Sequence, residues 1–215
     1  MKYGLRVLMG LVFGAALMAV APASATNYLT GTSGSIWTDL AGYGNGGPFN
    51  ASNVPGTPAN ATFVPGAINY NSNVTGYTIG AFLNGAAITP AAVGSVDMGA
   101  GTGNTFVQIT GNVTLAAGNN PFNLVHDDGA VLSIAGLGTV FSQPNPTSAV
   151  TNVFNVVAPS AGSYAFTLDY VECCSPPAVL GLSVAPSPGP VPGAGLPGLA
   201  VLALVGGWAW VRKFA

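Results

Sequence analysis

The chain has 215 residues, which is enough for one sizeable domain. Only 5% of the residues are charged, and 31 glycines and 17 prolines make up more than a fifth of the chain, which excludes an ordinary charged, helical cytosolic protein. The basic residues lie at the two extreme ends, so the chain between them cannot neutralise phosphates, and we expect no nucleic-acid partner. They are Lys2, Arg6, Arg212 and Lys213.

The first 25 residues have the three parts of a secretory signal peptide. Lys2 and Arg6 give a positive start, Val7–Ala21 is apolar, and Ala23–Ala25 is a run of small residues suited to cleavage. We therefore expect export, with the mature chain beginning at Thr26. The alternative is a stable membrane anchor, but the apolar run is short for a span of about 20 residues.

Residues 26–184 are expected to form one domain, and the pattern is clearest over residues 105–184. In Thr105–Leu115, apolar residues alternate with polar ones, which is the two-residue period of a half-buried strand. The apolar positions are Val107, Ile109, Val113 and Leu115.

Two hairpins are predicted in the second half of this domain. In the first, Pro121–His126 and Ala130–Ile134 flank an Asp-Asp-Gly turn. In the second, Tyr164–Tyr170 and Leu180–Val184 flank a turn that contains two prolines. Residues on alternate positions of each run are apolar, so we expect one face of each hairpin to be buried.

The fold class predicted for the domain is all-β, an antiparallel β-sandwich or jelly-roll-like barrel. No stretch between Thr26 and Pro190 has a sustained apolar period of 3.6 residues, and Gly, Asn and Pro interrupt the chain every few residues. The Gly- and Asn-rich stretch Gly31–Asn60 is expected to form long loops.

A Pro-rich linker, residues 185–193, leads to an apolar segment at the end of the chain. Gly195–Val211 has no charge, contains two tryptophans, and is followed by Arg212 and Lys213, which predicts a single helix stopped by basic residues.

This tail, residues 194–215 with Val191-Pro192-Gly193 before it, resembles the PEP-CTERM sorting signal of Gram-negative bacteria. The motif here lacks the acid and the second proline of the usual Val-Pro-Glu-Pro. The resemblance implies processing by an exosortase, transient anchoring in the inner membrane, and delivery to the cell surface, the outer membrane or an exopolysaccharide matrix such as a biofilm. A simple C-terminal membrane anchor is the alternative.

Catalytic chemistry finds little support in the sequence. His126 is the only histidine, which excludes a metal site built on several histidines, and no Gly-x-Ser-x-Gly motif accompanies it. We expect His126 to form local hydrogen bonds. Six carboxylates are present, but their spacing selects no pair for glycoside hydrolysis. We therefore expect that the protein is not an enzyme, with a polysaccharide hydrolase as the third alternative.

Two short segments remain as candidates for a site. Asp127-Asp128-Gly129 can be read as a common hairpin turn or as a pair of metal ligands. Glu172 precedes both cysteines in a second connecting segment. Together the segments offer three carboxylates, and hard oxygen ligands of this kind suit Ca²⁺ better than zinc or copper.

A second resemblance covers about 80 residues. The run Asn123–Leu132, followed by Ala161–Tyr164, the strand Phe166–Tyr170 and the segment Ala178–Val184, resembles the protective-antigen (PA-fourteen) domain. In the adhesin branch of that family, paired aspartates bind one calcium ion that also contacts sugar hydroxyls.

The resemblance implies specific roles for residues of this chain. Asp127 and Asp128 match the aspartate pair, and Glu172 falls where the family has an asparagine ligand. Cys174 and Pro176 fall where backbone carbonyls contact the ion and the sugar. The predicted metal ligands are therefore Asp127, Asp128 and Glu172.

Cys173 and Cys174 are the only cysteines. Because they are adjacent, they cannot join distant segments, and export favours their oxidation. Either a vicinal disulfide that stiffens the loop or a link between two molecules is compatible with the sequence.

These observations predict an exported surface or matrix protein that binds carbohydrate or matrix polysaccharide through a calcium-dependent loop site. The main alternative is a structural exopolysaccharide-matrix protein without a ligand site.

Overall fold

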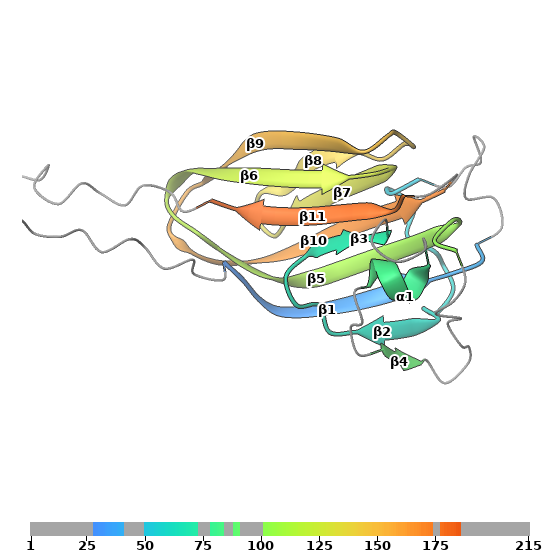
Figure 1. Cartoon of the computed structure of the whole chain (residues 1–215). Helices are drawn as coiled ribbons and strands as arrows, with labels where there is room; N and C mark the ends of the chain where they lie inside the picture. The colour runs from blue at the N-terminus through green and yellow to red at the C-terminus, as the bar shows by residue number, and fades with distance from the viewer. Residues whose placement is uncertain are drawn as a thin grey trace, which may run out of the picture.

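The computed structural model describes residues 28–40, 50–72, 78–83, 88–90, 101–173 and 177–185. These residues form an antiparallel β-sandwich, as the sequence predicts, with one short helix (Figure 1). The elements are β1 (Leu29–Trp37), β2 (Ala61–Phe63), β3 (Asn69–Asn71), α1 (Ile79–Phe82), β4 (Ile88–Pro90), β5 (Thr105–Leu115), β6 (Gly118–His126), β7 (Gly129–Ile134), β8 (Gly138–Gln143), β9 (Val150–Ala158), β10 (Gly162–Glu172) and β11 (Val179–Val184).

The sandwich has a larger and a smaller sheet. The seven-stranded sheet has the order β4-β2-β1-β5-β10-β7-β8, and the four-stranded sheet has the order β3-β11-β6-β9. All strand pairs in both sheets are antiparallel.

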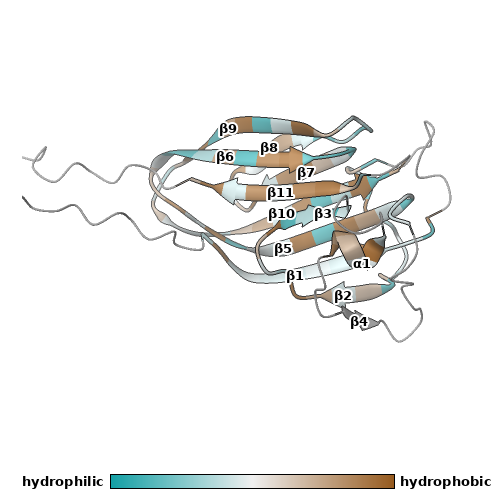
Figure 2. Cartoon of the chain, viewed as in Figure 1, coloured by the Kyte–Doolittle hydropathy of each residue, from teal (hydrophilic) through white to brown (hydrophobic). Residues whose placement is uncertain are grey.

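The core lies between the two sheets. The strand predicted over Thr105–Leu115 is β5, and its four alternate apolar side chains are at most 1% exposed. Phe166 and Leu168 of β10 are also buried, as their alternation predicts. Figure 2 shows hydrophobic and hydrophilic bands along β5 and β6, and buried residues alternate with more exposed ones over much of both strands.

Both predicted hairpins are wrong, because each pair of strands is divided between the two sheets. β6 pairs with β9 and β11, whereas β7 pairs with β8 and β10. Likewise β10 belongs to the larger sheet and β11 to the smaller one. Period-2 alternation is the same whether the next strand lies beside the first or faces it across the core, so the pattern could not separate the two cases.

The Asp-Asp-Gly segment is therefore a crossing between sheets. Asp128 has a left-handed backbone conformation, with φ of 62°. Gly129 is needed for a different reason, because a Cβ at this position would clash with the carbonyl oxygen of Pro144. The glycine thus permits a close approach of two backbones instead of forming a two-residue hairpin turn.

The prediction of long loops over Gly31–Asn60 is wrong for β1. This strand is rich in Gly, Ser and Thr, so its sequence carries little alternation. It forms because it pairs with β5 on one side and β2 on the other. Gly34 makes room for the ring of Phe63, with which a Cβ would clash.

The described chain ends lie together at one end of the sandwich, here called the terminal end. The carbonyl of Tyr28 accepts a hydrogen bond from Thr114, and the amide of Ala185 donates to Pro121. The opposite end, here called the cluster end, contains His126 opposite Leu180 and Glu172 opposite Thr105.

The predicted signal peptide, sorting helix and all of the linker except Ala185 lie outside the described residues. Within the part of the chain that the structure describes, no helix has both the length and the apolar character needed to cross a bilayer.

Candidate functional site

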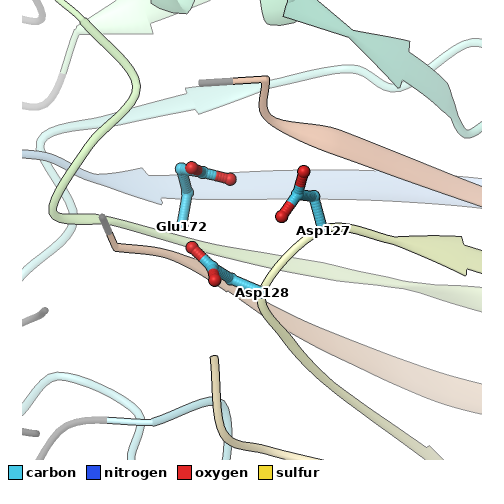
Figure 3. Close-up of side chains that lie close together, drawn as sticks. All are labelled: Asp127, Asp128 and Glu172. Carbon is cyan, nitrogen blue, oxygen red and sulfur yellow. The ribbon is translucent and has the colours of Figure 1, made fainter. Parts of the chain in front are cut away.

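Three predicted residues meet at the cluster end of the sandwich. Asp127 and Asp128 come from the β6–β7 crossing, and Glu172 is the last residue of β10. A carboxylate oxygen from each lies within 4.8 Å of the others, and Figure 3 shows the three side chains converging. Their exposed fractions are 7%, 5% and 0%. We call Asp127, Asp128 and Glu172 the acid cluster.

Backbone amides on both sides hold Asp128. Its Oδ2 accepts a hydrogen bond from the amide of Cys173 at 2.7 Å, and its Oδ1 accepts one from the amide of Thr147 at 3.2 Å. Its own amide donates to the carbonyl of Thr147 at 2.9 Å. Since an ionised carboxylate has about four lone-pair sites, Asp128 can accept further bonds or a metal.

His126 fixes the backbone of this crossing, as expected of a locally bonded histidine. Its Nδ1 lies 2.6 Å from the carbonyl oxygen of Asp128, so Nδ1 carries the proton and donates. Its Nε2 then accepts from the side-chain amide of Asn152 at 3.0 Å. The ring is fully buried and does not belong to the acid cluster.

Glu172 is only partly satisfied by the protein. The hydroxyl of Tyr170 donates to Oε2 at 2.7 Å, whereas Oε1 is buried and has no hydrogen-bond partner among the described residues. Sequence analysis did not give Tyr170 this role. The spacing indicated this contact, because Tyr170 and Glu172 are two residues apart on one strand and therefore point to the same face.

Burial and mutual repulsion change the acidity of the cluster. Burial, together with the negative charge of Asp128, raises the pKa of Asp127 to about 6, against the lowering effect of a backbone hydrogen bond. Burial is also the main cause that raises the pKa of Glu172 to about 9; the charges of both aspartates add to it, and the Tyr170 hydrogen bond opposes it. No Lys or Arg lies between positions 7 and 211, so protons or a metal ion must neutralise the cluster.

Asp169, another of the six carboxylates, lies outside the acid cluster. It is on β10 and accepts a hydrogen bond from the side chain of Gln108. Cys173 is disulfide-bonded, but Cys174 and Pro176 lie outside the described residues. The predicted ligand role of these last two residues, and the choice of disulfide partner, stay predictions.

A shallow groove adjoins the cluster beside Asp128. Its volume is about 390 Å³, and Thr147, whose amide donates to Asp128, is one of its walls. Sequence analysis missed this groove, because the segment carries no motif. It is lined by Ser142, Gln143, Pro144, Asn145 and Thr147.

No family model and no curated protein matches the chain. Among solved structures, the PA14 domain of the antifreeze protein MpAFP is 22% identical, with 79% of this chain and 89% of that chain covered and a TM-score of 0.51. A PA14 sugar-binding domain from an RTX adhesin is 19% identical, with coverages of 71% and 86% and a TM-score of 0.48. A β-glucosidase from Kluyveromyces marxianus in complex with glucose is 12% identical, with coverages of 79% and 17% and a TM-score of 0.46.

The similarity to the MpAFP domain concerns the fold, since the identity is low. It establishes a PA14-like β-sandwich for this chain. The fold implied by the protective-antigen resemblance is thereby confirmed.

Proposed function

We propose that this protein is an exported surface or matrix protein that binds carbohydrate through a calcium ion held by the acid cluster. The observation that carries the proposal is the burial of three carboxylates within 4.8 Å of one another in a chain with no Lys or Arg between positions 7 and 211. Gathering these charges without a cation is unfavourable.

The donor set fits calcium. Calcium takes six to eight oxygen ligands, and carboxylates are its preferred protein donors. Oε1 of Glu172 is buried without a partner, so one lone pair is available without breaking a protein hydrogen bond. Asp127 and Asp128 would supply the other carboxylate oxygens. When bound, the ion would accept sugar hydroxyls in place of its water ligands.

The carbohydrate class is supported by two features. Asp127 and Asp128 match the aspartate pair of the adhesin branch of the protective-antigen family. The groove beside Asp128 offers the hydroxyl and amide groups of Ser142, Gln143, Asn145 and Thr147, and no charged side chain lines it. Neutral hydrogen-bonding groups of this kind suit uncharged sugars.

The position of the cluster suits a surface protein. The described chain ends leave from the terminal end, and the acid cluster lies at the other end. A domain attached through its ends would therefore present the site outward. Export by the predicted signal peptide and exosortase processing of residues 194–215 belong to this proposal.

A structural matrix protein is the second candidate. It is favoured by the pKa of Glu172 near 9, because a protonated Glu172 would relieve much of the repulsion without a metal. A hydrolase is less compatible with the geometry, since a fully buried Glu172 cannot reach a polysaccharide as a general acid. We therefore propose binding and no catalysis.

Terbium luminescence tests the calcium site on the purified full-length chain. Tb³⁺ replaces Ca²⁺ at oxygen-rich sites. Tyr170 is hydrogen-bonded to Glu172, so its ring lies close enough to the acid cluster to sensitise terbium emission. We expect tyrosine-excited terbium emission that excess calcium displaces. Asp128→Asn should abolish it, and the matched control Asp169→Asn, on β10 outside the cluster, should retain it.

Retention on purified exopolysaccharide tests the carbohydrate class. The wild-type chain should bind in calcium, elute with a chelator and bind again when calcium returns. Terbium binding without polysaccharide retention would restrict the site to a structural metal. Absence of both would favour the structural matrix protein.

A further inference from the structure

The four edges of the two sheets are protected unequally. Exposed strand edges can pair with another chain, and proteins usually blunt them with short strands, bulges, prolines or charges. β3 and β4 are edge strands of only three residues each. β8 has six residues, and the ladder that joins it to β7 shifts register at Leu132/Ser133.

β9, the remaining edge strand, has none of these protections. It has nine residues, pairs with β6 in nine consecutive positions without a register shift, and contains neither a charge nor a proline. No strand of the described part of the chain pairs with its outer edge.

The outward face of β9 also carries unusual apolar exposure. Val153 is 76% exposed and Val157 is 65% exposed. Thr151 and Asn155 lie on the same face and are exposed as well. This edge thus combines unpaired backbone groups with solvent-exposed valines, and this combination favours pairing with another strand.

We propose that β9 pairs with β9 of a second copy of this chain, antiparallel and about a two-fold axis at Asn155. In this register Val153 faces Val157 of the partner subunit, and by symmetry the same pair forms a second time. Asn155 faces its own equivalent. The two four-stranded sheets would join into one continuous sheet.

A second copy of the chain is the partner that fits this edge, because the exposed side chains of β9 are complementary to those of an antiparallel copy of β9. The spacing Val153-x-Asn155-x-Val157 is symmetric about its centre, so both exposed valines find an apolar cross-strand neighbour in one register. Like charges do not oppose the contact, because β6 and β9 contain no Asp or Glu.

The antiparallel arrangement has a consequence for binding, which rests on the proposed function. Val150 lies opposite His126 near the cluster end, and Ala158 lies opposite Gly118 near the terminal end. Two copies paired through β9 would therefore point in opposite directions. Their acid clusters would lie at opposite ends of the dimer, which would make it a bivalent cross-linker of released polysaccharide or of two facing surfaces.

Light scattering after size exclusion tests the dimer on the full-length chain, in chelator and without glycan, so the result is independent of the calcium site. A mild non-ionic detergent prevents association through the apolar segments at the beginning and the end of the chain. We expect a concentration-dependent dimer that Val153→Lys weakens about tenfold or more, because both valine pairs are lost together. Val64→Lys is the matched control, since Val64 is 71% exposed but lies outside β9. A wild-type monomer, or equal effects of both variants, would overturn the proposal.

Disulfide trapping tests the register. Asn155→Cys should form a covalent dimer under mild oxidation, because opposed residues in an antiparallel pair have Cα atoms about 4.5 to 5.5 Å apart. Val153→Cys should not, because the two equivalent positions would be four residues apart along the strands, about 13 Å, beyond disulfide reach. The parent chain controls for links through its native cysteines. Trapping of Val153→Cys instead of Asn155→Cys would refute the two-fold axis at Asn155.

Discussion

Both ends of the sandwich bury polar side chains at crossings between the sheets, but the hydrogen bonding of these side chains differs between the two ends. At the terminal end, Asn120 is 2% exposed, and its Oδ1 accepts from the amide of Ala116 at 2.8 Å. Its Nδ2 donates to the carbonyls of Ala116 and Gly118 at 2.9 Å. At the cluster end, three carboxylates converge and Oε1 of Glu172 has no partner among the described residues.

This difference distinguishes a polar group whose hydrogen bonds are complete from one that needs a further partner. Buried polar groups in proteins are nearly always hydrogen-bonded, so each exception needs a cause. Asn120 closes the β5–β6 crossing with neutral, complete hydrogen bonding. The acid cluster is incomplete without protons or a cation, which is the basis of the calcium site proposed above.

The largest expected effect is at the terminal end. Asn120→Ala should lower the free energy of unfolding by about 2 to 4 kcal/mol, because it removes the four hydrogen bonds of the buried Asn120 side chain, each worth about 0.5 to 1.5 kcal/mol. Urea unfolding with and without calcium measures the loss, which should be equal in both conditions. Asn119→Ala, at an exposed neighbouring position, is the control. A loss that calcium reverses would contradict the division between the two ends.

Calcium should stabilise the cluster end. At a hundredfold excess over Kd, the linkage relation predicts a gain of about 2.7 kcal/mol in the free energy of unfolding. Asp128→Asn should remove most of that gain, while Asn120→Ala should keep it. Thermal unfolding of the full-length chain measures both. If calcium and chelator give the same melting temperature for the wild type, the calcium site is wrong.

The calcium-free protein should lose stability as pH rises. The folded-state pKa values of Asp127 and Glu172, about 6 and about 9, lie above those of the unfolded chain, so the folded state binds more protons. The stabilising protons are present below about pH 4 and are lost between about pH 4 and pH 9. We expect a decrease of about 1 to 2 kcal/mol over this range, since water entering the loops relieves part of the cost of burying these charges.

Two variants check the origin of this pH dependence. Glu172→Gln should flatten the upper part of the profile, and Asp127→Asn should flatten the lower part. A calcium-free wild type that becomes more stable from pH 6 to pH 9 would contradict the assignment of Glu172, and one that becomes more stable from pH 4 to pH 6 would contradict that of Asp127.

Sequence reasoning found the parts of this molecule that a single strand determines. The bounds of β5 and the burial of Phe166 and Leu168 follow from local alternation. It failed where the partner strand decides, as in β1, where Gly34 makes room for the ring of Phe63 on β2. It also failed at the Asp-Asp-Gly crossing, because alternation does not tell which sheet the next strand joins.

The acid cluster could be predicted only in part for the same reason. Composition and family resemblance selected Asp127, Asp128 and Glu172 before their distance was known. The groups that hold them come from segments without a motif, such as Thr147 and Asn152. Thr147 acts through its backbone amide, and Asn152 acts because β9 lies beside β6. Residue identity encodes neither of these.

The smallest expected effect concerns Asn152 on β9, whose side-chain amide donates a hydrogen bond to His126 at the cluster end. Asn152→Ala removes the donor to Nε2 of His126 and the weaker contact to Gln143, leaving a buried ring nitrogen without its partner. We expect a loss of about 1 kcal/mol in the free energy of unfolding. His126 donates to the backbone of Asp128, so a looser ring should also weaken terbium binding, by less than Asp128→Asn does. Asn155→Ala, on an exposed position of the same strand, should leave terbium affinity unchanged. If the two variants bind terbium equally well, the bond from Asn152 serves stability alone, and Asp128 is positioned by its contacts with Thr147 and Cys173.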